Sequence, residues 1–163
     1  MLVNFKIRKM KKQDIEDVQN VARKSWNATY EGIIPDQIQQ SFLNLVYSDV
    51  MMEQRLSQSL FLVAEVDNRV VGFANYSPVN DAGKVELSAI YIYPDYQGIG
   101  VGTALLKEGI KLSAGVKEIY IDVEQENGVG RSFYQTKGFT TVDKFDDDFD
   151  GHILKTLRMV LEV

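Results

Sequence analysis

Residues 90–104 read IYIYPDYQGIGVGTA, and this stretch does most to decide the fold. An apolar, β-type run reaches Pro94, passes into a glycine-rich turn and continues as a helical pattern. Glycines let a backbone come close to a ligand, and the free N–H groups at a helix start suit an anion. The stretch therefore predicts a strand, a turn that holds a phosphate or pyrophosphate, and a helix. A plain tight turn would explain the same glycines without a ligand.

Two nucleotide-binding motifs share part of this pattern. A dinucleotide fingerprint needs a third glycine where Thr103 stands, although Asp122 ends the next predicted strand, as that fingerprint expects. The turn also follows several earlier elements instead of lying in a first strand–helix unit. A P-loop is excluded because no Lys-Ser or Lys-Thr pair follows the glycines. A nicotinamide-dependent oxidoreductase therefore stays a weak alternative.

The spacing of apolar residues predicts the helices and strands on both sides of this stretch. Before the turn, the predicted segments are a strand at residues 3–9, a helix at 12–25, a helix behind Pro35, a short helix capped by Ser48, a hairpin of Leu60–Val66 and Arg69–Tyr76 around Asp67-Asn68, and a strand at 84–93. After it, they are a helix at residues 100–114, a strand at 118–123, a helix at 131–137, and strands at 139–145 and 154–161. This order predicts an α+β domain with a mixed sheet instead of a regular βαβ repeat.

The composition narrows the classes of protein. A chain of 163 residues with 45% hydrophobic residues and only 3 prolines fits one folded domain and argues against disorder. Its net charge of −5 disfavours nucleic-acid binding, and without cysteine it has no disulfide or thiolate metal site. The longest apolar run, residues 60–64, is too short to cross a membrane, and the basic start lacks the apolar segment of a signal peptide. A soluble, cytoplasmic protein is expected.

Three blocks of the sequence resemble the GCN5-related N-acetyltransferase (GNAT) family. The spacing Gln97-x-x-Gly100-x-Gly102 resembles the family's acetyl-CoA signature. Residues 127–139, NGVGRSFYQTKGF, look like its second conserved block, with Gly130 where the family usually has Ala, a small-for-small difference. Residues 25–35, SWNATYEGIIP, are similar to a first-helix segment of one branch. The blocks occur in the family's order and cover nearly the whole chain.

The resemblance implies one GNAT acetyltransferase domain over residues 1–163. That fold is a mixed, mostly antiparallel seven-stranded sheet with a splayed central strand pair and about four to five helices. Acetyl-CoA would be the cosubstrate, with no metal ion. The bulged strand before the signature would pair with the pantetheine arm and polarise the thioester carbonyl, and the turn amides would hold the pyrophosphate. The implied acetyl-CoA contacts are Ile90, Tyr91, Ile92, Gln97, Gly98, Ile99, Gly100, Val101, Gly102, Thr103, Asn127 and Tyr134.

Acetyl transfer to an amine also requires the movement of protons, because the amine loses one before attack and the departing thiolate gains one. Tyr134 matches the family's usual general acid, and packing in the core beside Phe133 is the alternative. Glu86 lies at the spacing before Gln97 at which one branch carries its catalytic glutamate. Asp122 matches the base position of another branch. A water relay with no single base stays open, in which case both carboxylates only serve the sheet.

The acceptor is expected to be a primary amine that attacks directly in a ternary complex, because neither a cysteine nor a Ser–His pair offers a covalent intermediate. The net charge favours a cationic acceptor, such as a polyamine, a basic antibiotic or a protein N-terminus. Trp26, Asn27 and Tyr30 would contact it, although Trp26 and Tyr30 could equally form a core aromatic pair. No nucleic-acid or membrane partner is expected, and a homodimer is open. A non-catalytic acyl-CoA-binding sensor or scaffold is the second hypothesis.

An acidic tip, DDDFDG at residues 146–151, separates the last two predicted strands. It matches the opening of an EF-hand loop, but Leu157 stands where that loop needs Glu. A solvated hairpin loop is therefore expected, with a cation-facing rim for a basic acceptor as the alternative. The only histidine, His152, is expected to be solvated at this tip.

Overall fold

The computed structural model describes residues 4–163, which build a seven-stranded sheet in the order β1-β2-β3-β4-β5-β7-β6. The strands are β1 Lys6–Lys9, β2 Leu60–Val66, β3 Arg69–Tyr76, β4 Lys84–Ile92, β5 Glu118–Glu124, β6 Thr140–Phe149 and β7 His152–Glu162. The α-helices are α1 Ile15–Tyr30, α2 Asp36–Val46, α3 Asp49–Gln58, α4 Val101–Leu112 and α5 Gly128–Thr136, with 3-10 turns at η1 Lys12–Asp14 and η2 Pro94–Tyr96. In this sheet β4 and β5 are parallel and the other neighbours are antiparallel. The expected mixed, mostly antiparallel sheet is confirmed.

Local chemistry explains the boundaries that the sequence predicts well. Strands β2 and β3 join at Asp67-Asn68, whose φ values of 49° and 64° make the expected two-residue hairpin turn. The Ser48 hydroxyl accepts a hydrogen bond from the N–H of Met51 and so caps α3. Both devices act within a few residues of the chain, which is why the sequence alone reveals them.

Several predicted boundaries differ from the structure. Helix α1 continues beyond Ser25 to Tyr30, so the aromatic residues of its last turn lie on the helix. Helix α5 begins at Gly128 instead of residue 131, because the Asn127 side chain caps it. The predicted start of the first strand, residue 3, lies outside the described residues, and the described strand β1 begins at Lys6.

The acidic tip is the exposed end of a hairpin, as predicted, but the prediction that residues 146–151 form a loop is wrong. Strands β6 and β7 continue through it to a two-residue turn at Asp150-Gly151, where φ is 51° and 83°. Phe149 beside this turn lies 4.8 Å from the Phe42 ring and 5.9 Å from the Trp26 ring, measured between centroids. The hairpin end is therefore packed against α1 and α2.

His152 is also placed differently from its prediction. Its side chain is half-buried, and its Nε2 atom lies 3.1 Å from the carbonyl oxygen of Ile33. This contact joins the start of β7 to the loop between α1 and α2. His152 therefore fastens the hairpin end instead of standing in solvent.

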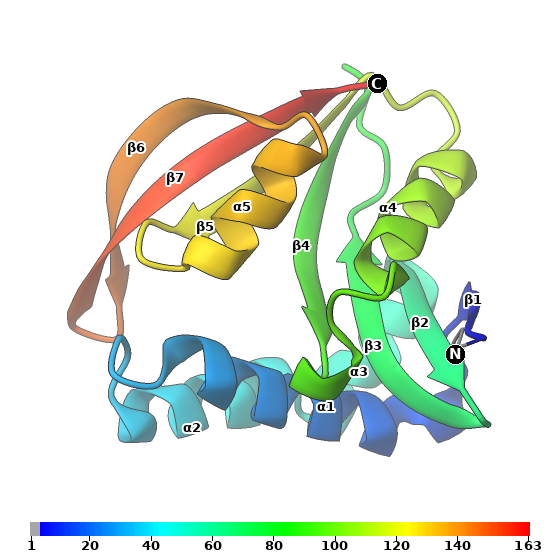
Figure 1. The fold of residues 1–163 in the computed structure, drawn as a ribbon, viewed down its shortest axis with the longest axis horizontal. Helices are drawn as coiled ribbons and strands as arrows, with labels where there is room; N and C mark the ends of the chain where they lie inside the picture. The colour runs from blue at the N-terminus through cyan, green and yellow to red at the C-terminus, as the bar shows by residue number, and fades with distance from the viewer. Residues whose placement is uncertain (1–3) are drawn as a thin grey trace.

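Strands β4 and β5 separate soon after they meet. They pair over Lys84–Glu86 and Glu118–Tyr120 and then diverge (Figure 1). On the other side of β4, a bulge in its pairing with β3 leaves Ser88 without a strand partner, between Leu87 and Ala89. The expected splayed pair and the expected bulge are both present.

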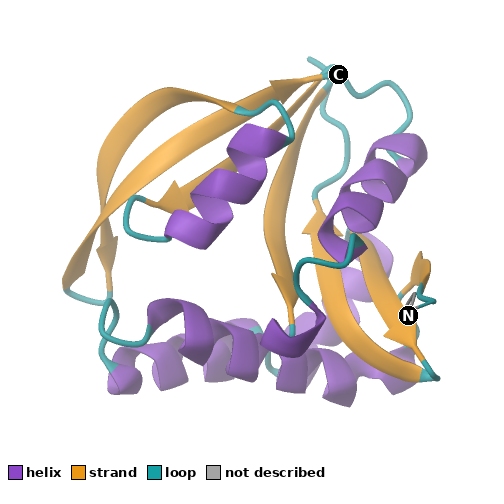
Figure 2. Cartoon of the chain, in the orientation of Figure 1, coloured by secondary structure: helices purple, strands orange, loops and turns teal. Residues whose placement is uncertain are grey.

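Helices cover both faces of the sheet (Figure 2). Helices α4 and α5 lie on either side of β4 in Figure 1. Successive residues of a strand face opposite sides. Tyr91 thus lies 6.4 Å from the Trp26 ring of α1, whereas the Cγ1 and Cδ1 atoms of Ile92 lie near Gly72 and near Gly102 of α4. The helices α1 and α4 therefore sandwich β4. No helix within residues 4–163 is long and apolar enough to cross a membrane.

The contact between β3 and α4 is the tightest in the core. The fully buried Tyr76 donates a hydrogen bond from its hydroxyl to the Leu105 carbonyl, 3.0 Å away. Its ring lies against Gly109, where an added Cβ would be 2.2 Å from the Tyr76 Cζ atom. The helix can approach the sheet this closely only because residue 109 has no side chain.

We predict that Gly109→Ala destabilises the protein, although alanine is the better helix former by about 1 kcal/mol. The Cβ must displace a fully buried ring, and such overpacking costs roughly 1–3 kcal/mol. Urea denaturation would measure the change. Gly128→Ala is the control, because an added Cβ there meets nothing within 4 Å. Equal loss in both variants, or none in Gly109→Ala, would contradict the packing argument.

Candidate active site

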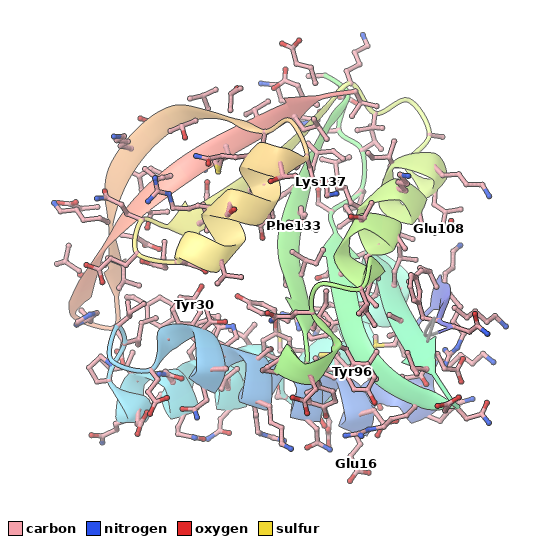
Figure 3. The ribbon with its side chains drawn as sticks, viewed as in Figure 1. Glu16, Tyr30, Tyr96, Glu108, Phe133 and Lys137 are labelled. Atoms are coloured by element: carbon pink, nitrogen blue, oxygen red, sulfur yellow. The ribbon has the colours of Figure 1, made fainter. Side chains whose placement is uncertain are left out.

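A groove of about 740 Å³ opens between α4 and α5, where β4 and β5 diverge. This volume lies in the range of about 300–1,000 Å³ that ligand pockets occupy. Figure 3 marks three of the lining side chains, which are Phe133 on α5, Lys137 directly after that helix and Tyr30 on α1. Of the predicted acetyl-CoA contacts, these line the groove: Ile90, Tyr91, Ile92, Gln97, Gly98, Gly100, Gly102, Thr103, Asn127 and Tyr134. Ile99 is exposed and Val101 is buried, and neither side chain lines it.

The turn before α4 presents a run of free backbone donors. The N–H groups of Gln97 and Ala104 bond to the carbonyls of Pro94 and Gly100. None of the N–H groups between these two residues has an acceptor within residues 4–163. Gly100 makes the turn possible, since its φ of 95° is left-handed. The geometry fits an anion at the positive end of the α4 dipole, as the glycine pattern predicts.

Strand β4 offers a second set of backbone groups to the groove. Because it leaves β5 after Glu86, the side of β4 that faces the groove has no strand partner beyond that residue in the described sheet. Gln97 closes the far end of this edge, since its side-chain amide donates to the Ile92 carbonyl at 3.3 Å. An extended ligand with amide groups can pair with an edge of this kind.

Asn127 is held by its own helix. Its side-chain oxygen accepts a hydrogen bond from the Gly130 N–H at 2.9 Å, and a Cβ on Gly130 would lie 2.7 Å from the Asn127 Nδ2 atom. The difference between glycine and alanine at residue 130 is therefore larger than their sizes suggest. Alanine there would displace the Asn127 amide from this cap.

A second cavity, of about 280 Å³, lies on the opposite side of β4. Its aromatic walls are Trp26, Tyr30, Phe42, Tyr47, Phe61, Tyr91 and Phe149. Its charged side chains are the guanidinium of Arg55 and the carboxylates of Glu86, Asp122, Glu124 and Asp147. The Trp26 indole N–H is buried and has no acceptor within residues 4–163. A buried donor of this kind favours an oxygen atom from water or a ligand in the cavity.

The groove and the second cavity meet at the bulge of β4. Tyr30, Ser88, Ala89, Tyr91 and Asp122 line both of them. A group held in the groove can therefore reach a molecule in the second cavity through the gap between β4 and β5. The Trp26 and Tyr30 rings pack in a tilted arrangement with their centroids 4.6 Å apart, and both residues line the second cavity. The pair can therefore be a core contact and a substrate contact at once. Asn27 is exposed and lines neither space.

Burial keeps the tyrosines at this junction protonated. Desolvation raises the pKa of Tyr134 well above the usual value for a phenol, and it does the same for Tyr30 and Tyr91. The Tyr134 ring also packs edge-on against Phe133 and Phe139. Tyr134 can therefore pack in the core through its ring and still donate a proton through its hydroxyl.

The two predicted bases differ in their environment. Asp122 forms a bidentate pair with Arg158, at 2.8 Å and 3.0 Å, across β5 and β7. The carboxylate of Glu86 lies 3.5 Å from the hydroxyl of Tyr120, on the strand where β4 and β5 part. The guanidinium of Arg158 therefore engages both carboxylate oxygens of Asp122, whereas Glu86 has a single contact with a hydroxyl.

Glu124 is the carboxylate that the sequence analysis missed. It is half-buried, and desolvation, with the charges of Asp147 and Glu126, raises its pKa to about 7. The period-2 alternation of β5 places it on the same face as Asp122. Sequence pattern alone cannot distinguish it from an ordinary surface glutamate, because its environment comes from distant elements.

Comparisons with known proteins agree with this geometry. The profile of the Acetyltransferase (GNAT) family matches residues 16–139. A spermidine N(1)-acetyltransferase from Thermoplasma acidophilum is 33% identical over 155 residues, which are 90% of this chain and 95% of that protein. The crystal structure of the PaiA N-acetyltransferase from Thermoplasma acidophilum, in complex with coenzyme A, has a TM-score of 0.88 at 29% identity and covers 98% of this chain and 99% of that chain. A GCN5-related N-acetyltransferase from Rhodopseudomonas palustris, at 20% identity and a TM-score of 0.83 over 100% and 99% of the two chains, shares the fold.

We predict that Gly100→Ala weakens coenzyme A binding about tenfold. A left-handed alanine costs roughly 1–2 kcal/mol, and relief of that strain turns the free N–H groups away from the groove. Isothermal titration calorimetry would measure the affinity. Gly32→Ala is the matched control, because Gly32 has a φ of 79°, no atom within 4 Å of an added Cβ, and no place in either cavity. Equal affinity of both variants and the wild type would exclude the turn as the anion site.

Proposed function

The chain belongs to the GNAT acetyltransferase family, and on that premise we propose that it acetylates a terminal primary amine of a polyamine, directly and within a ternary complex. As a member of this family it is an acetyl-CoA-dependent N-acetyltransferase. The observation that carries the acceptor class is the aromatic, carboxylate-rich cavity that joins the groove at the bulge of β4. We also infer that residues 1–163 act as one acetyltransferase domain.

The groove offers acetyl-CoA the contacts that its chemistry requires. The free N–H groups between Gln97 and Ala104 suit the pyrophosphate, and the unpaired edge of β4 suits the two amides of the pantetheine arm. Bound in this way, acetyl-CoA supplies an activated acetyl group as a thioester. The bulge at Ser88 lies where the two cavities meet, so the backbone of residues 88–90 would orient the reacting end.

The second cavity favours a cationic acceptor. Four carboxylates face one guanidinium in its lining, and aromatic rings such as Trp26 and Phe149 attract an ammonium group through their π-faces. A polyamine has a terminal primary amine and further positive charges along an apolar chain. The positive charges suit the carboxylates of the second cavity, and the apolar chain suits its aromatic rings. The name of the Thermoplasma acidophilum relative, a spermidine N(1)-acetyltransferase, supports the same acceptor class.

Tyr134 is the proposed proton donor to the leaving thiolate. Its buried ring lines the groove, and its raised pKa keeps the hydroxyl protonated at neutral pH, so that it can donate. Direct transfer agrees with the chain's lack of cysteine. The lone histidine, His152, lies against the Ile33 carbonyl and does not line either cavity.

We expect the protein to release free coenzyme A thiol from acetyl-CoA when spermidine is present. A thiol-reactive dye would measure this release. Acetyl-CoA alone should raise the apparent stability by about 2.7 kcal/mol at a hundredfold excess over its Kd, and NADH should not. The control substrate is a peptide with a free N-terminus and only uncharged side chains. It should be acetylated more slowly than spermidine. Faster turnover of the peptide would overturn the polyamine assignment.

We predict that Tyr134→Phe lowers kcat with spermidine about 10²-fold and leaves coenzyme A affinity near the wild-type value, since loss of a general acid costs at least about that factor. Tyr96→Phe removes a hydroxyl from a half-buried ring of η2 that lines neither cavity, and it should turn over normally. Normal turnover of Tyr134→Phe would assign this tyrosine to packing alone.

A further inference from the structure

We propose that Glu124, at the end of β5, is the carboxylate that receives the proton from the acceptor's ammonium group. The inference rests on the proposed function and concerns a residue that the acetyl-CoA signature does not include. Its starting point is the set of four carboxylates in the second cavity, which differ in how far the protein already neutralises them.

Two of these carboxylates have protein partners. Asp122 is held by the guanidinium of Arg158 in a bidentate pair, so its charge is neutralised before any acceptor arrives. Glu86 lies within 3.5 Å of the Tyr120 hydroxyl, at the closed end of the splay where β4 and β5 are still paired. Asp122 therefore has both carboxylate oxygens engaged, and Glu86 has one oxygen near a hydroxyl at the end of the gap where the strands are still paired.

Glu124 and Asp147 have no such partners. Neither side-chain carboxylate forms an ion pair or a hydrogen bond within the described residues 4–163. They lie on β5 and β6, with buried Thr156 of β7 opposite Glu124 in the strand register. Two unpaired negative charges in a partly desolvated place are costly, and an ammonium group relieves both. Asp147, which is exposed, would hold the ammonium at the rim, and half-buried Glu124 would receive its proton.

Glu124 lines the second cavity and not the groove, but it differs from Asp147 in its effect on the residues that line both. Its charge acts on Tyr30 and on Tyr91, which line both the groove and the cavity. The unpartnered N–H of Trp26 belongs to the same wall. An amine beside Glu124 is therefore also beside the place where the groove opens into the cavity.

The proton steps balance as follows. The ammonium transfers one proton to Glu124, and its nitrogen lone pair becomes free to form the bond to the acetyl carbon. As that bond forms and the carbon–sulfur bond breaks, the nitrogen loses a second proton. The sulfur gains one proton, which Tyr134 supplies and then recovers from the nitrogen. Glu124 releases its proton to solvent, and the products are an acetamide, a free thiol and one proton.

The titratable groups that face Glu124 come from several elements. They are Asp147 of β6, Glu126 of the following loop, Tyr30 of α1 and Tyr91 of β4, and the β7 residue opposite it does not titrate. Desolvation, with the charges of Asp147 and Glu126, raises the pKa of Glu124 to about 7, and both tyrosines stay neutral. A base must be ionised, so kcat/KM is expected to rise as pH increases through about 7 and then level off.

The test is a pH profile of spermidine acetylation by Glu124→Gln and the wild type, at saturating acetyl-CoA. At pH 7 we expect kcat/KM of the variant to fall by about 10²-fold or more, with unchanged coenzyme A affinity. The rise near pH 7 should disappear. In its place, the rate should increase about tenfold per pH unit as the free amine becomes available in solution. Glu124→Asp, which keeps a carboxylate, should recover part of the activity and the original profile.

Glu118→Gln is the matched control, because it removes the same charge from the same strand and face, outside both cavities. Its profile should equal that of the wild type. Three results would overturn the role of Glu124: an equal loss in Glu118→Gln, a rise near pH 7 that persists in Glu124→Gln, or a change in KM without a change in kcat. Wild-type protein that releases no thiol with any amine would instead overturn the proposed function, and the role of Glu124 with it.

Discussion

Strands β4 and β5 share a short parallel pairing and then part, and the space between them determines where everything else in the molecule can act. Backbone groups that lose a strand partner must find another acceptor or donor, because leaving them buried and unpaired is costly. The free edge of β4 is therefore both a cost to the fold and a ready binding surface. The bulge at Ser88 helps to open this gap, because it bends β4 at the point where the gap begins.

The gap also separates opposite charges. On the side of α4 and α5, a helix start with free N–H groups attracts an anion. On the other side of the same strand, carboxylates and aromatic rings attract a cation. An anionic cosubstrate and a cationic acceptor can thus approach from different faces, and they meet only where Tyr30 and Tyr91 line both spaces.

Much of this could be predicted from the sequence where the controlling chemistry is local. The hairpin at Asp67-Asn68, the cap at Ser48 and the turn at Gly100 each depend on residues that are close together in the chain. The GNAT resemblance supplied the sheet and its splay. Local patterns could not show that the acidic stretch 146–149 continues as a strand, because that depends on its pairing with β7.

The site was less predictable than the fold because its chemistry depends on residues that are far apart in the sequence. Asp122 and Glu124 look alike in the sequence, two positions apart on one strand. Arg158 of β7 neutralises the first, whereas Asp147 of β6 adds to the charge around the second. Which carboxylate is free is therefore decided by residues more than twenty positions away, and no motif records it.

The end of the β6–β7 hairpin gives the molecule an order of assembly. Phe149 lines the second cavity and packs on Trp26 and Phe42, and His152 beside it contacts the Ile33 carbonyl. These three partners all lie within the first 42 residues of the chain. During synthesis the groove residues and the first helices all leave the ribosome before this hairpin. The cosubstrate side can thus be formed while the acceptor side is still open, and contacts of such long range form slowly. The second cavity thus needs both ends of the chain, and it exists only when the hairpin has packed onto the first helices.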